Sequence, residues 1–409
     1  MRVIGINAVY GIASTGRTVK QLNDGLKEFG IESSTVYFNG PGTDKDMHIN
    51  TPSGVKLHGF MARLSGKAGY YSAAATKKLL DYLDEQRPDI VHLHNLHSNF
   101  IKLPMLFDYL SERQIPVAVT LHDCWWYTGK CTHYTLDGCY RWQSGCGSCP
   151  RLKKDIPSWL FDRTGELLAD KQRWFSSVHP LAVIGVSDWI TNEAKKSFLG
   201  DADIIERIYN WIDTDVFKPN GNVIKTRFGL ENKTVLLTVA SQWADSKGLA
   251  AFIELSHRLP EDTVLVMIGQ CHQKEKRDLS KILLVPATEN QTELANWYSA
   301  ADVFISLSME ESFGKVTAEA LACGTPVIAV NSTASPELIG ENCGEVINDT
   351  KPQTVLDAVN RIVNTDKNSY LLHCRRFAER SFNMKKCIEQ TAEVYRRLLR
   401  VRSGDIKQC

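Results

Sequence analysis

The chain has 409 residues, of which 43% are hydrophobic and 23% are charged, and its formal net charge is +1. This length exceeds the usual size of a single hydrophobic core, so two domains are expected. The near-neutral charge argues against nucleic acid as the main partner, because nucleic-acid-binding domains are usually basic. No apolar run reaches the ~18 to 20 residues that cross a bilayer. The first residues also lack a signal-peptide core, so a cytoplasmic protein is expected.

The chain begins with a predicted strand over Arg2–Val9 and a predicted helix over Val19–Phe29. The turn between them, Gly11–Thr18, is one residue away from a phosphate-binding P-loop. A nucleoside triphosphatase is disfavoured because Arg17 stands where that loop needs the point charge of a lysine. The turn is therefore either a phosphate-facing loop or simply a tight connection from strand to helix.

Polar residues follow the next two predicted strands. Gly40–Gly69 shows little periodicity and is predicted as loops, whereas Tyr71–Gln86 is predicted as a helix. The strand Asp89–His94 then delivers four polar side chains at its carboxyl end: His92, His94, Asn95 and His97. A His-x-His pair is a zinc-binding arrangement, but no third ligand is evident nearby, so these side chains are expected to line a ligand site. The strand Pro116–Leu121 ends on His122.

The stretch 124–150 is unusually rich in cysteine and reads CWWYTGKCTHYTLDGCYRWQSGCGSCP. Four of its cysteines have the spacing C-x7-C-x6-C-x2-C: Cys131, Cys139, Cys146 and Cys149. Four thiolates on a turn-rich loop suit a structural zinc ion, which would order a segment that lacks a core of its own. Unliganded thiols are the main alternative, and a redox or disulfide role is less expected in a reducing compartment.

Aromatic residues gather in and after this stretch: Trp125, Trp126, Tyr127, Trp142, Trp159 and Trp174. Such rings can stack on a sugar ring or lie at a membrane interface. Packing around the cysteine-rich stretch is the plainer explanation. The sequence leaves these three alternatives open.

The clearest turn signal lies at Lys218–Gly221, and we place the domain boundary there. The alternation of strand and helix then resumes, with the strand Thr234–Ala240 and the helix Gly248–Leu259 as its first pair. Strand-then-helix repeats in both halves predict two doubly wound α/β domains. No G-x-G-x-x-G follows the first strand of either half, so a Rossmann dinucleotide enzyme is disfavoured.

The stretch Ser306–Val330 reads SLSMEESFGKVTAEALACGTPVIAV and predicts a strand, a short helix and a second strand. The helix N-terminus near Gly314 is expected to attract phosphate. Glu311 and Glu319 would stand roughly 12 Å apart along a helix axis. Carboxylates that share hydrolytic work lie only about 5 to 9.5 Å apart. The two acids therefore suit opposite ends of one long ligand, unless they are simply solvated surface glutamates.

The run E-S-F-G-x-x-x-x-E-A-L-A-C-G-T-P-V-I in this stretch resembles the signature of the retaining GT-B glycosyltransferases of the family-4 type. Glu206–Asn210 and Asp213–Pro219 are similar to the linker of that family, and Trp211 between them stands in place of its glycine. The pattern H-D-x-W…T-G-x-C…C…C-x-x-C-P resembles a subset of bacterial transferases that build colanic acid, capsules and O-antigens. The resemblance covers nearly the whole chain. It implies the GT-B fold, with two doubly wound Rossmann-like domains facing each other across a cleft.

The resemblance also implies a site for the nucleotide-sugar donor. Glu311 would bind hydroxyls of the donor sugar and Glu319 the ribose, while amides near Gly314 and Lys315 would hold the diphosphate. The implied donor-binding set is Gly16, Arg17, Gln242, Lys247, Asn290, Glu311, Ser312, Phe313, Gly314, Lys315 and Glu319.

Three residues are implied as catalytic: His122, Glu311 and Lys247. His122 would contact the donor sugar or its phosphate, and Lys247 would stabilise the departing diphosphate electrostatically. Gln242 stands where relatives usually carry a second phosphate-binding cation, an arginine. Arg17, Lys315 or the helix-end amides would have to compensate for that missing charge.

The resemblance implies transfer of a sugar, with retention of configuration, from a nucleotide diphosphate sugar to a saccharide acceptor. The expected acceptor is a lipid-linked oligosaccharide in the synthesis of O-antigen, capsule or exopolysaccharide. The alternatives are a nucleotide-sugar epimerase of the same architecture and a non-catalytic sugar-nucleotide binding protein. No D-x-D pair presents itself as a metal-diphosphate site, so no cofactor is expected for catalysis, and the structural zinc is the one metal predicted.

The expected domains are residues 1–218 for the acceptor, residues 219–384 for the donor, and residues 385–409 as a helix that crosses back to the N-terminal domain. The end of that helix is rich in arginine. Basic segments of this kind bind anionic lipid headgroups, although charge runs are more often solvated helix faces. A peripheral contact with the cytoplasmic face of the inner membrane is therefore a further expectation.

Overall fold

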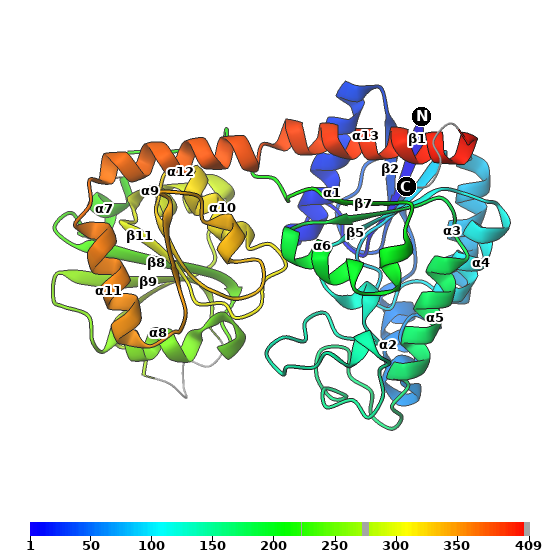
Figure 1. Cartoon of the computed structure of the whole chain (residues 1–409), viewed down its shortest axis with the longest axis horizontal. Coiled ribbons are helices and arrows are strands. Elements are labelled where there is room, and N and C mark those ends of the chain that lie inside the picture. Colours follow the sequence, from blue (N-terminus) through cyan, green and yellow to red (C-terminus); the bar gives the residue numbers. More distant parts are fainter. Residues whose placement is uncertain (222, 272–277, 405–409) are drawn as a thin grey trace. The chain divides into compact units, whose positions relative to one another are not determined.

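The computed structural model describes residues 1–221, 223–271 and 278–404, and the chain divides into two compact α/β units (Figure 1). The first unit comprises Met1–Ile208 and Lys385–Cys409, and the second comprises Tyr209–Met384. The division after Ile208 precedes the turn at Lys218–Gly221, where the sequence placed the boundary. Within the described ranges, no helix combines the length and the hydropathy needed to cross a membrane.

The first unit is built on a seven-stranded sheet in the order β3-β2-β1-β4-β5-β6-β7. Its strands are β1 (Arg2–Ile6), β2 (Glu32–Tyr37), β3 (Met47–His48), β4 (Ile90–Leu93), β5 (Val117–Leu121), β6 (Leu181–Gly185) and β7 (Ile204–Arg207). Its helices are α1 (Ala13–Leu26), α2 (Pro52–Ser65), α3 (Ala73–Gln86), α4 (Leu103–Glu112), α5 (Thr164–Ser176), α6 (Asp188–Lys195) and most of α13 (Met384–Ser403). The paired strands are parallel, and all residues of β5 and β6 are buried, as expected for central strands covered on both faces.

The second unit is built on a six-stranded parallel sheet in the order β10-β9-β8-β11-β12-β13. Its strands are β8 (Thr234–Gln242), β9 (Thr263–Gln270), β10 (Ile282–Val285), β11 (Val303–Ser306), β12 (Val327–Val330) and β13 (Gly344–Ile347). Its helices are α7 (Val223–Phe228), α8 (Leu249–Ser256), α9 (Gln291–Ala300), α10 (Lys315–Ala322), α11 (Pro352–Val363) and α12 (Lys367–Ser381). Apolar residues of β8, β9 and β11 pack with those of α8 and α11 into one core. The predicted pair of doubly wound α/β domains is confirmed.

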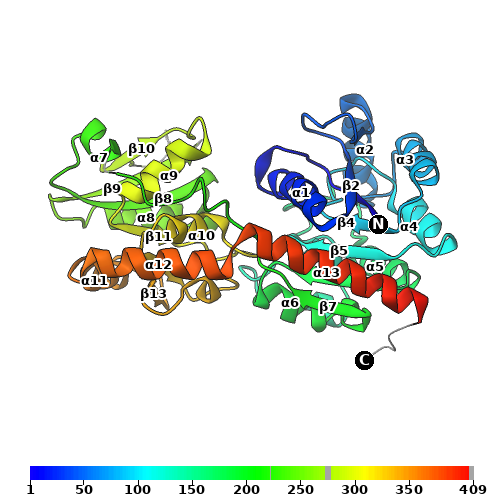
Figure 2. The same cartoon turned by 90° about the horizontal axis from the view of Figure 1, so that it is seen from above.

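Helix α13 packs on elements of the first unit, as Figure 2 shows. Ile388 lies against α1 so closely that a Cβ on Gly25 would stand 2.5 Å from Ile388 Cδ1. Farther along α13, the buried hydroxyl of Tyr395 lies 2.7 Å from His92 Nδ1 of β4. Gly25 and Tyr395 thus help to fix the C-terminal helix against α1 and β4.

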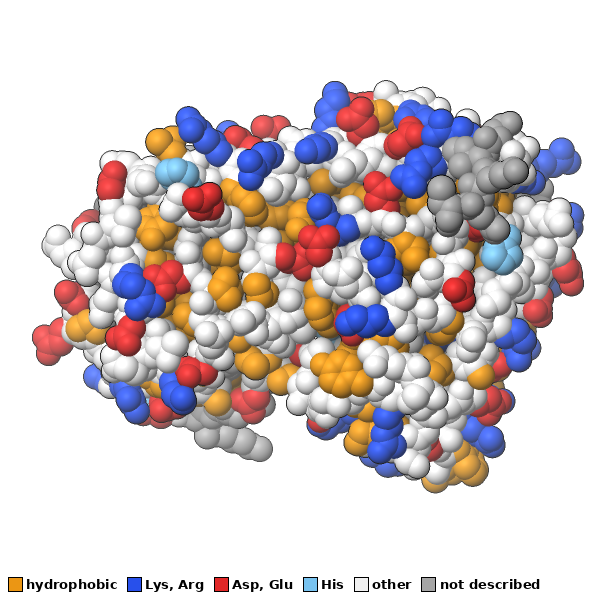
Figure 3. Space-filling model, in the orientation of Figure 1, with side chains coloured by type: hydrophobic (Ala, Val, Ile, Leu, Met, Phe, Trp, Pro, Cys, Tyr) orange, Lys and Arg blue, Asp and Glu red, His pale blue; other side chains and the backbone are white. Residues whose placement is uncertain are grey.

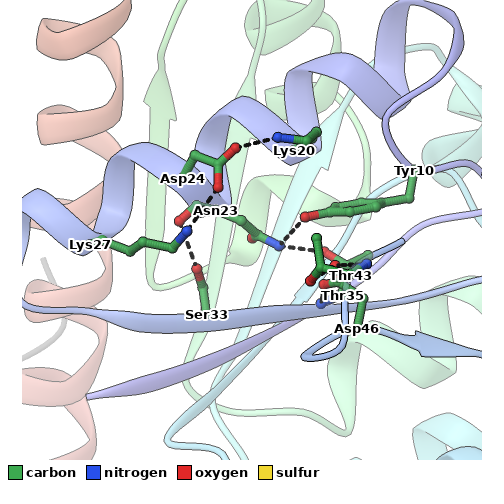
Figure 4. Close-up of polar contacts among 9 residues, drawn as sticks. All are labelled: Tyr10, Lys20, Asn23, Asp24, Lys27, Ser33, Thr35, Thr43 and Asp46. Atoms are coloured by element: carbon green, nitrogen blue, oxygen red, sulfur yellow. Dashed lines mark hydrogen bonds and ion pairs between the residues drawn. The ribbon is translucent and has the colours of Figure 1, made fainter. Parts of the chain in front are cut away.

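A buried polar network holds α1 against β2 (Figure 4). Asn23 donates hydrogen bonds to Tyr10 Oη at 3.3 Å and to Thr35 Oγ1 at 2.8 Å. The carboxylate of Asp46 accepts from the amides of Thr35 and Thr43. Because each polar group finds a partner, burial of this network is not destabilising, and it fixes the turn that precedes α1.

The segment Gly40–Gly69 differs from its prediction. It contains the short strand β3 and the 14-residue helix α2, whereas the sequence predicted loops. Helix α2 has a clear start, because Thr51 accepts a hydrogen bond from Gly54 N at 3.1 Å and Pro52 occupies the first turn. Only three of its residues are buried, so the usual apolar periodicity is missing.

Candidate functional site

Two loops of the second unit, which follow β8 and β11, are joined around Lys247. These strands are parallel neighbours, so their carboxyl ends share one edge of the sheet. Lys247 Nζ donates to Glu311 Oε1 at 2.6 Å and to Ser308 Oγ at 3.3 Å. The amide of Met309 donates to the carbonyl of Ser246 at 3.3 Å. The structure therefore brings together Lys247 and Glu311, which lie 64 residues apart in sequence.

This ion pair is open enough to exchange partners. The side chain of Lys247 is 37% exposed and that of Glu311 is 17% exposed. Glu311 is anchored through its backbone, because its amide donates to Thr333 Oγ1 at 2.9 Å. An anion that reaches Lys247 would share its charge, while the carboxylate keeps accepting positions for hydroxyl groups. The pair can thus hold a phosphate beside a sugar.

Two glycines shape these loops. Gly248 has φ of +81°, and a Cβ there would stand 2.6 Å from Leu307 Cβ, so only glycine lets the two loops meet. Gly314 has φ of +91° and forms the N-cap of α10, which begins at Lys315. The first amides of α10 lie in this loop, and the N-terminus of a helix attracts anions.

Glu319 lies inside the second unit. It is 6% exposed, and its Oε2 accepts a hydrogen bond at 3.1 Å from the hydroxyl of the fully buried Tyr298. Burial and the nearby charge of Glu319 raise the pKa of Tyr298 well above its usual range. The alternative of a solvated surface glutamate is therefore wrong for Glu319, and its ribose-binding role stays a prediction.

Several other residues of the predicted donor set have structural contacts. Phe313 is 2% exposed and packs against two aromatic rings of the same unit. Asn290 caps α9 by accepting from Glu293 N at 2.9 Å. Gln242 is exposed at the end of β8, and Ser312 and Lys315 are half-buried. Donor contacts by these residues stay predictions.

In the first unit, three histidines gather at the carboxyl ends of β4 and β5. His122 Nε2 lies 3.1 Å from His94 Nδ1, and the two rings are stacked with centroids 5.3 Å apart. His92 lies between two hydroxyls, those of Tyr395 at 2.7 Å and Thr120 at 2.8 Å. Burial lowers the pKa of His92 to about 3 and that of His94 well below its usual range. His122 is therefore supported by a neutral imidazole.

A further polar pair at this edge joins His97, which was predicted to line a ligand site, to Asp123, which was not predicted. Asp123 Oδ2 lies 3.1 Å from His97 Nε2, and its Oδ1 accepts from the amide of Trp125 at 2.9 Å. Burial alone would raise the pKa of Asp123, but the contacts with His97 and with that amide lower it. Its position directly after His122 at a strand end is the sequence signal that could have found Asp123.

In the turn before α1, the first turn of the helix lies close to the backbone that follows β1. Gly11 has φ of +70°, and its amide donates to the carbonyl of Gly16 at 2.9 Å. A Cβ on Gly16 would stand 3.0 Å from the backbone of Val9, so glycine is required there for packing. The side chain of Arg17 is exposed. These contacts support the tight-turn interpretation, and the phosphate contacts of Gly16 and Arg17 stay predictions.

The structural zinc prediction for Cys131, Cys139, Cys146 and Cys149 is not supported. The four residues line one cavity of about 20 Å³. Within the part of the chain that the structure describes, however, no cluster of three or more His, Cys, Asp or Glu side chains is placed to hold a metal ion. The premise behind the prediction was also wrong, because the stretch 124–150 has a core of buried aromatic rings: Trp125, Trp126, Tyr127, Tyr134 and Trp142.

A buried lysine also holds this cysteine-rich stretch. Lys171 of α5 is 2% exposed, and its Nζ donates to the carbonyls of Trp125 at 2.6 Å and Thr128 at 2.9 Å. The same ammonium lies 3.9 Å from the centroid of the Trp125 ring. Packing and these hydrogen bonds do the ordering that the prediction assigned to zinc, and packing is confirmed for most of the clustered aromatic residues.

Family models match both halves of the chain. The model described as "Glycosyltransferase Family 4" matches residues 15–216, and the model described as "Glycosyl transferases group 1" matches residues 222–383. The two matches lie in the first and second halves that the sequence distinguished. Lys247, Glu311 and Glu319 fall within the second match.

Curated relatives cover different shares of the chain. WcaC of Escherichia coli, named for colanic acid biosynthesis, is 21% identical over 384 residues, which are 85% of this chain and 88% of that protein. A D-inositol 3-phosphate glycosyltransferase of Xylanimonas cellulosilytica is 28% identical over 244 residues. That match covers 50% of this chain and only 55% of the relative.

Solved structures share the fold over nearly the whole chain. The sucrose-phosphate synthase of Thermosynechococcus elongatus superposes with a TM-score of 0.71 at 16% identity, covering 98% of this chain and 99% of that one. The Anabaena protein HepE in complex with UDP-glucose gives a TM-score of 0.66 at 15% identity, covering 96% and 99%. The chain therefore belongs to glycosyltransferase family 4 and is a retaining hexosyltransferase of the GT-B fold that uses a nucleotide-sugar donor.

Proposed function

We propose that the protein transfers a hexose from a nucleotide diphosphate sugar to a lipid-linked oligosaccharide during the synthesis of a surface polysaccharide. Similarity to WcaC over 88% of its length supports this class of pathway. The proposal assigns acceptor binding to the first unit and donor binding to the second. The acceptors to be tested are lipid-linked oligosaccharides from the synthesis of O-antigen, capsule or exopolysaccharide.

The observation that carries the proposal is the 2.6 Å pair of Lys247 and Glu311 beside the start of α10. Lys247 neutralises the diphosphate, the amides at Gly314 and Lys315 hold it, and Glu311 accepts from hydroxyls of the sugar. The bond between the anomeric carbon and the phosphate oxygen breaks, and the acceptor oxygen bonds to that carbon on the same face. The acceptor proton leaves with the diphosphate.

Other residues complete the proposed donor site. Glu319, fixed by Tyr298, binds the ribose, and Asn290 lies near the base. His122, held by the neutral His94, offers a ring nitrogen to the donor sugar or its phosphate. The proposed site is shaped or flanked by five further residues: Gly16, Arg17, Gln242, Ser312 and Phe313. No divalent ion takes part in this proposal, because the positive charge comes from Lys247 and the helix amides.

A panel of nucleotide sugars and lipid-linked acceptors tests the proposal. Product formation is followed by mass spectrometry, and the configuration of the new bond is determined by NMR. We expect product only when both substrates are present, with the sugar configuration retained and activity unchanged in a chelator. Turnover of donor to an isomeric nucleotide sugar without acceptor would instead identify an epimerase and contradict the proposal.

A further inference from the structure

Helix α2 presents its large apolar side chains to solvent. Its buried residues are small or polar: His58, Gly59 and Ala62. By contrast, Leu57 is 64% exposed and Phe60 is 49% exposed. A surface helix of a soluble domain normally does the reverse, with its large apolar residues facing the core. The packing of this unit therefore does not explain why the large apolar side chains of α2 face outward.

The orientation of α2 is firmly fixed. His58 Nδ1 lies 2.9 Å from Ser72 Oγ, and the amide of Gly69 donates to His58 Nε2 at 3.2 Å. Burial lowers the pKa of His58 to about 4, so this contact stays neutral near pH 7. The helix cannot rotate to bury Leu57 and Phe60 without breaking both hydrogen bonds.

A second segment extends the exposed apolar surface. Trp159, Leu160 and Phe161 are 46%, 62% and 50% exposed. Trp159 is tied to α2 twice, because its amide donates to the carbonyl of Arg63 at 2.7 Å and its ring meets that of Phe60 at 5.8 Å. The apolar patch thus consists of Leu57, Phe60, Trp159, Leu160 and Phe161.

Basic side chains border this apolar patch. Lys56, Arg63 and Lys153 are exposed, and α2 contains no acidic residue. The nearest acids of the second segment are engaged: Asp162 accepts from Cys149 N and Thr164, and Glu166 pairs with Lys67 and Arg163. Among the described residues, neither Lys56 nor Arg63 forms an ion pair. Along its lower right edge, Figure 3 shows hydrophobic side chains with Lys and Arg between them and a few Asp or Glu side chains beside them.

We propose that the apolar patch and its basic border form a docking surface for an anionic lipid bilayer. Tryptophan and phenylalanine favour the interfacial region of a membrane, where lysine and arginine meet anionic headgroups. A second copy of the chain fits less well, because two identical basic borders would repel each other. Docking needs neither donor nor acceptor, so its test is independent of the proposed function.

Sedimentation of the full chain with lipid vesicles is the first test. We expect binding to vesicles of phosphatidylcholine with phosphatidylglycerol, and little binding to phosphatidylcholine alone. High salt should weaken binding, because exposed charges are screened. Absence of binding to the anionic vesicles at low salt would overturn the proposal.

Substitutions locate the contact. Phe60→Ser combined with Trp159→Ser should weaken vesicle binding by at least about tenfold. The reason is that the bilayer no longer removes two large apolar side chains from water. Lys56→Glu combined with Arg63→Glu should weaken binding to anionic vesicles only. Leu372→Ser is the matched control, since Leu372 is 51% exposed in the second unit. Equal binding by the first variant and the wild type would overturn the assignment to this patch.

Quenching by brominated lipids keeps the proposal testable even if the double variant folds poorly. Trp159 is the exposed tryptophan, and the other eight are buried or half-buried. Vesicles with brominated acyl chains should quench part of the fluorescence of the wild type, and Trp159→Phe should bind normally yet lose that quenching. Unchanged quenching in Trp159→Phe would overturn the proposal. Self-association of the wild type that Phe60→Ser abolishes, without vesicle binding, would assign the patch to a second copy instead.

Discussion

At the scale of single residues, the proposed donor site depends on a few charged groups that follow the ends of strands. Lys247 and Glu311 come from different loops and meet at 2.6 Å, partly open to solvent. Neither group alone is unusual, because lysine and glutamate are common on surfaces. Their pairing beside the first amides of α10 gives one small region both signs of charge.

Glu311→Gln should lower kcat/KM for sugar transfer by about 10²- to 10³-fold, the usual cost of losing one electrostatic contact in an active site. The glutamine keeps the shape but loses the charge that pairs with Lys247. Glu345→Gln is the control, because Glu345 forms a surface ion pair with Arg361 in the same unit. Steady-state kinetics decide the matter, and near-normal kcat/KM in Glu311→Gln would refute this role.

The buried histidines predict a loss of stability in mild acid. His92 has a folded pKa of about 3, lowered by burial, and an unfolded pKa of about 6.5. Below about pH 6.5 the unfolded chain binds a proton that the folded chain does not, so the free energy of unfolding falls as pH falls. For each such group, the free energy of unfolding falls by at most ~1.4 kcal/mol per pH unit.

Urea denaturation between about pH 7 and pH 5 measures this dependence. The dependence of the free energy of unfolding on pH should become weaker in His92→Asn and should stay as in the wild type in Leu372→Ser, a change at an exposed side chain that does not titrate. A slope that is identical in all three proteins would show that His92 does not titrate on unfolding.

The family resemblance pointed to Lys247, Glu311 and His122, each of which follows an apolar strand in the sequence. It did not show how deeply any predicted site residue is buried. The burial of Glu319 depends on Tyr298, which no local pattern connects to it. Asn290 was predicted as a ligand, although asparagine three residues before a glutamate is also an ordinary helix cap.

At the scale of elements, the glycines decide whether the two loops of the second unit can meet. Gly248→Ala should destabilise the protein by more than the ~1 to 2 kcal/mol that positive φ costs an alanine. The reason is the added clash of Cβ with Leu307. Gly229→Ala is the matched control, since Gly229 has φ of +65° and open space around its Cβ position. Thermal denaturation compares the two, and equal losses would contradict the clash.

The cysteine-rich stretch should not depend on a metal for its order. A strong chelator is expected to leave the melting temperature unchanged, whereas Lys171→Met should lower it. That substitution leaves the buried carbonyls of Trp125 and Thr128 without their donor. Each unpaired carbonyl lowers the free energy of unfolding by about 1 to 3 kcal/mol. Differential scanning calorimetry provides both values, and a chelator-induced drop in the melting temperature would restore the zinc hypothesis.

The predictions for two elements were wrong, and each error has its own physical reason. Helix α2 escaped detection because its large apolar residues face outward and do not follow a core pattern. The cysteine-rich stretch was assigned a zinc ion because cysteine spacing is visible in sequence. The packing of Trp126 on Trp125 and on rings of α4 and α5, and of Trp142 on Tyr127 and Tyr134, is not visible there.

At the scale of the whole molecule, the chain consists of two units that each have their own parallel sheet. The alternation of strand and helix was enough to predict both, because parallel sheets need a helical return after nearly every strand. Periodicity alone could not show that α13 packs on the first unit, since the contacts of Ile388 and Tyr395 join positions more than 300 residues apart. The family then connects the two sheets to sugar transfer.

Titration calorimetry with a panel of nucleoside diphosphates tests the central claim most directly. The wild type should bind at least one of them, and Lys247→Met should weaken that binding by about tenfold or more, since a charged hydrogen bond is worth ~1.5 to 3 kcal/mol. Lys351→Met, a change in an exposed surface pair, should bind as the wild type does. Undiminished affinity in Lys247→Met, or no binding of any nucleoside diphosphate to the wild type, would contradict the account.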